Sequence, residues 1–182
     1  MRKAMHKGRE QNRPEPEDFT QTSLVNEDGS VQVTASFTGR DGELHSRMLT
    51  IEDGDDGTVV INAVSGDESR SQTITFSEDK ADSGIDIDIS CLTSEGEIKS
   101  RHIELDMNED GTLAMEVSFE HDGEQVVHSA QLDLAKFLGE EGEQLTMAEI
   151  VESYLERGHI DADSIDLTGI NNLTNDAELL VV

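Results

Sequence analysis

The chain has 182 residues, 41 of them acidic against 13 lysines and arginines, which gives a net charge of −28, and aromatic residues make up only 3%. This length suits one domain, and a core built from Val, Ile, Leu, Met and Ala without aromatic walls disfavours a roomy ligand cavity. The excess of acid repels nucleic acids and anionic membranes, so we expect no direct nucleic-acid contact through the acidic body and no membrane partner.

Residues 1–17 are predicted to form a disordered basic arm. Five lysines and arginines fall within the first 13 positions, where Glu10 is the only acid. The segment has no apolar period and contains both prolines of the chain, which is typical of unfolded segments. It is either an electrostatic tether to an acidic surface or a plain solvated tail. No hydrophobic stretch of a secretory signal accompanies the basic residues, so the expected location is the cytoplasm or a virion.

Residues 18–138 are predicted to fold as a β domain of four β-hairpin repeats of about 27 residues. Each copy has a turn, an apolar run that alternates or is continuous, a second turn and a return run. The alternation indicates strands, and Asp-Gly pairs such as Asp122-Gly123 supply the positive φ that tight turns need. Residues 19–25 add a first strand, which makes eight or nine strands. The glycines that begin the copies are Gly29, Gly57, Gly84 and Gly111.

The copies also match in pairs, which indicates that two hairpins were duplicated together. An offset of 54 residues aligns Val31 with Ile85, and Arg47 with Arg101, without a gap. One side of each strand is apolar and the other carries polar residues, so the fold class is a mainly β, antiparallel meander with one buried face. The sheet either closes into a barrel, curves under a C-terminal helix or forms a sandwich on dimerisation, because its edges need a partner.

Residues 139–182 are predicted to form one amphipathic helix and an apolar tail that pack on the β domain or on a neighbour. Thr146 and Glu149 make a capping box, and Gly158 marks the end of the helix. The connector before the helix carries Phe137 and Leu138, which we expect to cap the sheet. The candidates for partner contacts are the helix stripe and the chain end: Met147, Ile150, Val151, Tyr154, Leu155, Leu179, Leu180, Val181 and Val182.

No catalytic, cofactor-binding or metal residue can be assigned from the sequence. The acidic turns Asn26–Gly29, Asp53–Gly57 and Asn108–Gly111 lack the EF-hand pattern, so only weak, non-specific divalent cations are expected there. The six histidines show no zinc spacing, and nucleophile-elbow and phosphate-loop motifs are missing. Cys91 is the single cysteine, and its strand position predicts a small buried hydrophobe. We therefore expect no enzyme and no cofactor.

The leading hypothesis is a non-enzymatic structural or assembly protein that acts through protein–protein contacts, such as a component of a virion or another large assembly. Its partner is a protein, either a second copy in a homo-oligomer or a different chain. One alternative is a β-barrel module for a small apolar ligand, which requires a cavity among Val33, Ile87, Met115 and Leu132. The other is an acidic nucleic-acid mimic, which requires two rows of carboxylates spaced like phosphates.

Overall fold

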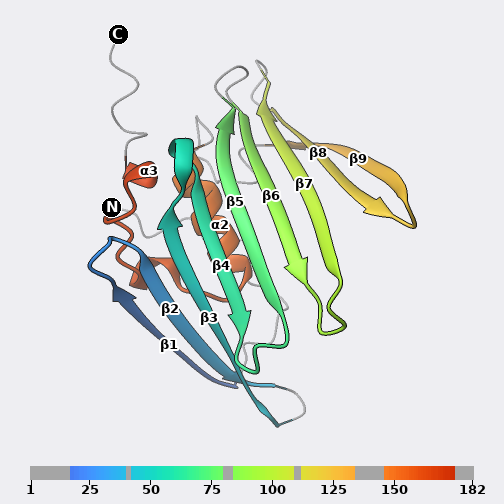
Figure 1. The fold of residues 1–182 in the computed structure, drawn as a ribbon. Helices are drawn as coiled ribbons and strands as arrows, with labels where there is room; N and C mark the ends of the chain where they lie inside the picture. Colours follow the sequence, from blue (N-terminus) through green and yellow to red (C-terminus); the bar gives the residue numbers. More distant parts are fainter. Residues whose placement is uncertain (1–16, 40–41, 80–83, 109–111, 134–145, 175–182) are drawn as a thin grey trace.

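The computed structural model describes residues 17–39, 42–79, 84–108, 112–133 and 146–174. Nine antiparallel strands form one sheet in the order of the sequence, from β1 to β9, and the sheet does not close (Figure 1). The predicted meander with a C-terminal helix is confirmed, and of the arrangements left open by the sequence the sheet does not adopt the closed barrel. The strands are β1 (Glu17–Val25), β2 (Val31–Thr38), β3 (Leu44–Asp53), β4 (Val59–Ser65), β5 (Ser71–Asp79), β6 (Gly84–Leu92), β7 (Ile98–Met107), β8 (Thr112–His121) and β9 (Glu124–Asp133).

Helical segments follow the sheet and cover part of one face, which we name the inner face. They are α2 (Met147–Arg157), the 3-10 turn η2 (Ala162–Ser164) and the short α3 (Asn171–Thr174), while a further 3-10 turn, η1 (Asp55–Gly57), joins β3 to β4. The predicted capping box is present, because the Thr146 hydroxyl accepts from the Glu149 N–H and the Glu149 carboxylate accepts from the Thr146 N–H. At the other end the left-handed residue is His159, with φ 61°, and Gly158 before it has φ −81°.

The described hairpin turns form where the sequence predicts them, with one difference, and Gly111 lies outside the described residues. Glycines at five turns have positive φ: Gly29, Gly42, Gly57, Gly96 and Gly123. Gly84 is instead the first residue of β6, where it pairs with Asp79 of β5. A Cβ on Gly84 would lie 2.9 Å from the carbonyl oxygen of Leu105, so this glycine permits close strand approach rather than a turn.

The core lies between the inner face and α2. Val33, Ile61 and Phe76 of the sheet are 0% exposed, and Val151 and Leu155 of the helix are equally buried. Burying apolar area at about 25 cal/mol per Å² is the main force that holds the helix on the sheet. The segment after the helix continues this layer with Ile160, Ile165, Ile170 and Leu173.

Polar contacts tie the end of this layer to the first strands. The Gln21 side-chain amide donates to the Asp161 carbonyl at 3.0 Å, and the Asp53 carboxylate accepts from the backbone N–H groups of Asn171 and Asn172. Gly29 and Gly169 meet backbone to backbone, since a Cβ on Gly169 would lie 2.9 Å from the Gly29 carbonyl oxygen.

The helical layer is narrower than the sheet. In Figure 1 α2 lies behind β4 and β5, the segment after it runs toward the side of the first strands, where α3 lies, and no described helix lies behind β8 and β9. The inner-face residues Ile103, Met115 and Val117 are consequently half-buried, although the apolar pattern predicts a buried face. Residues 1–16 of the basic arm, the connector with Phe137 and Leu138, and the chain end from Leu179 to Val182 lie outside the described residues.

Candidate functional site

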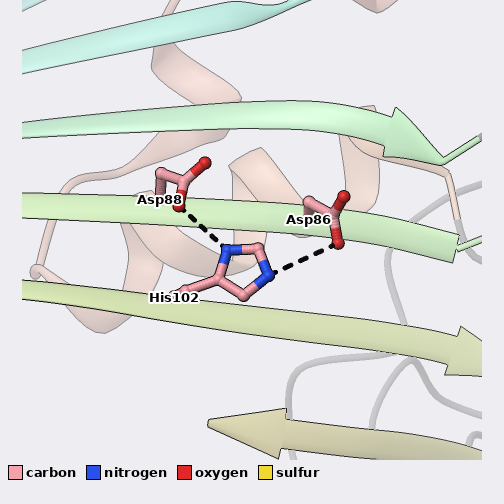
Figure 2. A network of polar contacts seen from close by, with 3 residues as sticks. All are labelled: Asp86, Asp88 and His102. Carbon is pink, nitrogen blue, oxygen red and sulfur yellow. Dashed lines mark hydrogen bonds and ion pairs between the residues drawn. The ribbon is translucent and has the colours of Figure 1, made fainter. Parts of the chain in front are cut away.

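A histidine held between two carboxylates lies on the outer face of the sheet. His102 of β7 is paired with Asp88 of β6, and its Nδ1 lies 2.9 Å from Asp88 Oδ1 while Nε2 lies 4.0 Å from Asp86 Oδ1 (Figure 2). The hydrogen bond with Asp88 raises the pKa of His102 above its ordinary value, and the negative charges of Asp88, Asp86 and Glu104 add to this effect against the opposing effect of burial. The site therefore favours a protonated histidine.

A row of carboxylates crosses the same face next to this histidine. The strand register places Asp86, Glu104 and Glu116 on adjacent strands, directly opposite one another. The pKa of Glu104 is raised, first by the charge of Asp106, then by burial and by its neighbours Asp86 and Glu116. Like charges opposite one another are destabilising in a sheet. The described residues bring together no group of three or more His, Cys, Asp or Glu side chains suited to hold a metal ion.

The second feature is an open groove of about 650 Å³ at one end of the inner face. It lies beside the turns that join β4 to β5 and β6 to β7. Two acids, Glu95 and Glu97, line it at the turn between β6 and β7, and the rest of its lining combines apolar and basic side chains, including Phe37, Arg47, Arg70, Gln72, Cys91 and Lys99. We name these six residues and the space between them the cationic groove.

Arg47 is the best-positioned cation of the cationic groove. Its Nη2 donates to the Tyr154 hydroxyl at 3.2 Å and to Gln72 Oε1 at 3.4 Å, and the Tyr154 hydroxyl donates to the same oxygen at 3.2 Å. The helix, β3 and β5 thus hold the guanidinium together. A guanidinium fixed in this way loses little entropy when it binds a carboxylate or phosphate.

Two more basic residues lie along β7 on the same face. Lys99 pairs with Cys91, and its Nζ lies 4.0 Å from Glu97 Oε2, with the lysine side chain 71% exposed. Arg101 faces Ile89 and lies over the ring of Phe119, with Cζ 5.9 Å from the ring centroid. This distance is within the range of a cation–π interaction.

The sequence contains a signal for the cationic groove that motif reasoning missed. The offset of 54 residues aligns Arg47 with Arg101 and His45 with Lys99. These positions alternate along their strands, so the duplication places basic side chains at equivalent places on the inner face.

The partner-contact candidates of the helix lie in the core instead of on a free surface. Met147, Ile150, Val151 and Leu155 are at most 4% exposed, and Tyr154 is half-buried with its ring edge toward Phe76. A partner could reach the four buried side chains only if α2 left the sheet. The remaining candidates, Leu179 to Val182, are outside the described residues.

Two carboxylates of the acidic turns form hydrogen bonds within the fold. Asp28 accepts from the Ser30 hydroxyl at 2.7 Å and from the Ser30 N–H at 3.0 Å, and these bonds lower the pKa of Asp28. Asp53 is occupied by the N–H groups of α3. The turn from Asn108 to Gly111 is described only at Asn108.

Cys91 differs from its prediction, because it is half-buried and lines the cationic groove. The helical layer ends before it reaches this position, so an inward strand residue keeps contact with solvent. Cys91 therefore offers a chemical probe of the groove.

Comparison with known proteins adds no identification, since no family model, no curated protein and no solved structure matches the chain. Within the described ranges, no helix has the length and apolar character needed to cross a membrane.

Proposed function

We propose that the protein is a non-enzymatic assembly component that acts through protein–protein contacts, as in a virion or another large complex. The observation that carries this proposal is the apolar inner face of β7–β9, which extends beyond the described helices. Met115, Val117 and Phe119 lie on this face and are only half-buried. Apolar surface that remains wet is characteristic of interaction sites.

The edges of the sheet support the same proposal. β1 and β9 end the strand order, so each has one side without a strand partner among the described residues. An unpaired edge is a template for pairing with another chain. β9 contains no lysine or proline, the residues that commonly protect an edge.

The two alternatives lack comparable support. The open sheet provides no barrel interior, on which a ligand-binding module depends. Mimicry of nucleic acid calls for two rows of carboxylates, and the described outer face places one row across β6–β8. The neighbouring row carries Asp88, His102 and Ser118.

The test compares two substitutions at adjacent positions of β8. Val117→Asp places a charge on the half-buried inner face, and Ser118→Asp places the same charge on the outer face. We expect the wild-type chain and Ser118→Asp to form a defined oligomer by light scattering at elevated salt, where repulsion between acidic bodies is screened. Val117→Asp should be monomeric and folded by circular dichroism.

Either of two outcomes would overturn self-assembly through this face. One is a wild-type chain that stays monomeric at every salt concentration, and the other is an oligomer that Val117→Asp leaves intact. In the first case the partner must be a different protein, and capture experiments that compare the same two variants would test for it.

A further inference from the structure

The lysines and arginines of the described residues are concentrated at one end of the molecule. Arg47, Arg70 and Lys99 line the cationic groove, and Arg101 follows Lys99 on the inner face of β7. Arg157 ends α2, next to Gly158, and Gly158 is close to the Arg47 guanidinium. The chain has about three acids for each base, so this concentration creates a local field opposite to that of the surrounding surface.

Three arginines in this region are not neutralised by the abundant acids. Arg47, Arg70 and Arg101 form no ion pair with a carboxylate of the described residues, and their polar contacts are to neutral groups or to a ring. Lys99 has only the exposed contact with Glu97. Arginines that are spared in so acidic a chain indicate a site for an external anion.

The surroundings of the cationic groove limit what this anion can be. Long polyanions such as nucleic acids would extend over the acidic surface, which repels them. A short segment with one or two carboxylates avoids this repulsion. Its apolar residues would meet the apolar lining that Phe37, Ala63 and Cys91 provide.

Two segments that follow the sheet and lie outside the described residues, 134–145 and 175–182, combine acids and apolar residues, and the second is the one whose acids precede an unbroken apolar run. Residues 175–182 read NDAELLVV, so two acids, Asp176 and Glu178, are followed by four consecutive apolar residues. They continue from Thr174, the end of α3, which is held at the β3–β4 turn by contacts with Asp53 and Thr58. The cationic groove lies at the opposite end of β4.

The distance from α3 to the cationic groove bears on whether the segment that binds there belongs to the same copy or to a second copy. The seven residues of β4 span about 23 Å. Asp176 and Glu178 follow Thr174 by two and four residues, which reach about 7 and 14 Å when fully extended. The backbone at these acids therefore falls short of the far end of β4, where Arg47 and Arg70 of the same copy lie, and a neighbour's segment has no such limit.

We infer that the cationic groove of one copy binds residues 175–182 of a second copy, an inference that rests on the proposed assembly function. Arg47, Arg70 and Lys99 pair with the two carboxylates, and the apolar end of the segment packs on the groove lining. The contact joins two different surfaces, so it is heterologous and extends to a ring or a filament.

Thiol labelling of Cys91 tests the occupant, because it is the only cysteine of the full chain and it lines the groove. We expect the labelling rate of the full chain to fall several-fold between low and high protein concentration. A synthetic peptide of residues 171–182 should slow labelling at low concentration, and the same peptide with Asp176→Asn and Glu178→Gln should not. A concentration-independent rate, or equal protection by an oligonucleotide, would overturn the inference.

Paired substitutions test the contact itself. Arg70→Gln with Lys99→Gln should remove the concentration dependence, whereas the control Thr34→Glu with Ser90→Glu alters the net charge equally on the exposed outer face and should preserve it. Asp176→Lys with Glu178→Lys should also remove it, and mixing this variant with Arg70→Glu/Lys99→Glu should restore it. If mixing fails to restore protection, the pairing is wrong.

Light scattering on the same samples separates the two proposals. An oligomer that survives in the groove variants, with Cys91 fully reactive, leaves the assembly function in place and overturns the groove contact. A wild-type chain that is monomeric at all concentrations overturns the groove contact and self-assembly, and leaves assembly with a different protein to the capture experiments.

Discussion

Two halves of one sheet, built from the same repeat, differ in what lies over them. We name β1–β5 with the helical layer the covered half, and β6–β9 the open half. In the covered half Val59, Ile61 and Ala63 are at most 3% exposed. Their equivalents 54 residues later are Leu113, which is buried, and Met115 and Val117, which are half-buried.

The comparison shows that the alternation of apolar residues determines which face of a strand is apolar, but not whether that face is buried. Both halves alternate in the same way and pair in the same antiparallel register. The difference in burial arises because α2 and the segment after it cover only about half of the sheet. The residues of the open half that this layer does not bury, such as Met115 and Val117, therefore combine the chemistry of a core with contact to solvent, as is found at interfaces.

Truncating one phenylalanine in each half should give the largest contrast. Phe76 is 0% exposed, and its ring packs edge to face with that of Tyr154, with the ring centroids 5.9 Å apart. We expect Phe76→Ala to reduce the free energy of unfolding by about 3–5 kcal/mol, because it leaves a cavity under the helix. Phe119→Ala removes a half-buried ring and should cost about 1–2 kcal/mol. Urea unfolding of the two variants measures both values, and equal losses would mean that β8 is covered in solution.

Removing the helix cap should have an intermediate effect that is confined to the covered half. Thr146→Ala deletes the hydroxyl that accepts from the Glu149 N–H at 3.3 Å. A lost cap of this kind costs about 1 kcal/mol. Hydrogen exchange should speed up in α2 and in β4–β5 beneath it, with β7–β9 unchanged. Faster exchange across the whole sheet would contradict the independence of the two halves.

The smallest effect should come from His102, on the outer face of the open half. The pKa of His102 is raised by its hydrogen bond with Asp88, so its contribution to stability is complete below the unfolded value of 6.5 and is lost as the pH rises through the folded value. His102→Gln should therefore cost about 0.2–1 kcal/mol near pH 5.5 and almost nothing near pH 9. An NMR titration should show a lower pKa of His102 in Asp88→Asn, and an unchanged pKa would exclude Asp88 as the cause.

The sequence predicts most of the fold because its local signals agree. Turn glycines such as Gly57 and Gly123 adopt positive φ, and strand alternation gives the register that the sheet has. Thr146 and Glu149 form the predicted cap, since capping depends on residues three apart in one turn. Closure of the sheet could not be predicted in this way, because it depends on shear and strand tilt over the whole sheet.

The candidate site was far less predictable than the fold. The helix stripe supplies Met147 and Val151 to the core, which leaves them unavailable as a free surface. The cationic groove brings together Arg47, Arg70 and Lys99 from separate hairpins, so no short motif contains it. The repeat offset that matches Arg47 with Arg101 is the only sequence signal for these cations. Whether they are accessible depends on how far the helical layer extends over the sheet.

The helical layer comes last in the sequence, which has a consequence during synthesis on the ribosome. Met147 follows Val33 by 114 residues, yet the two belong to one core. At about 5–20 residues per second, the ribosome needs about 6–23 s to deliver the helix after the first hairpin has emerged. During that interval the apolar face of the nascent sheet is bare, and a strong negative charge keeps such chains apart. The acidity of this protein thus protects it before its core exists.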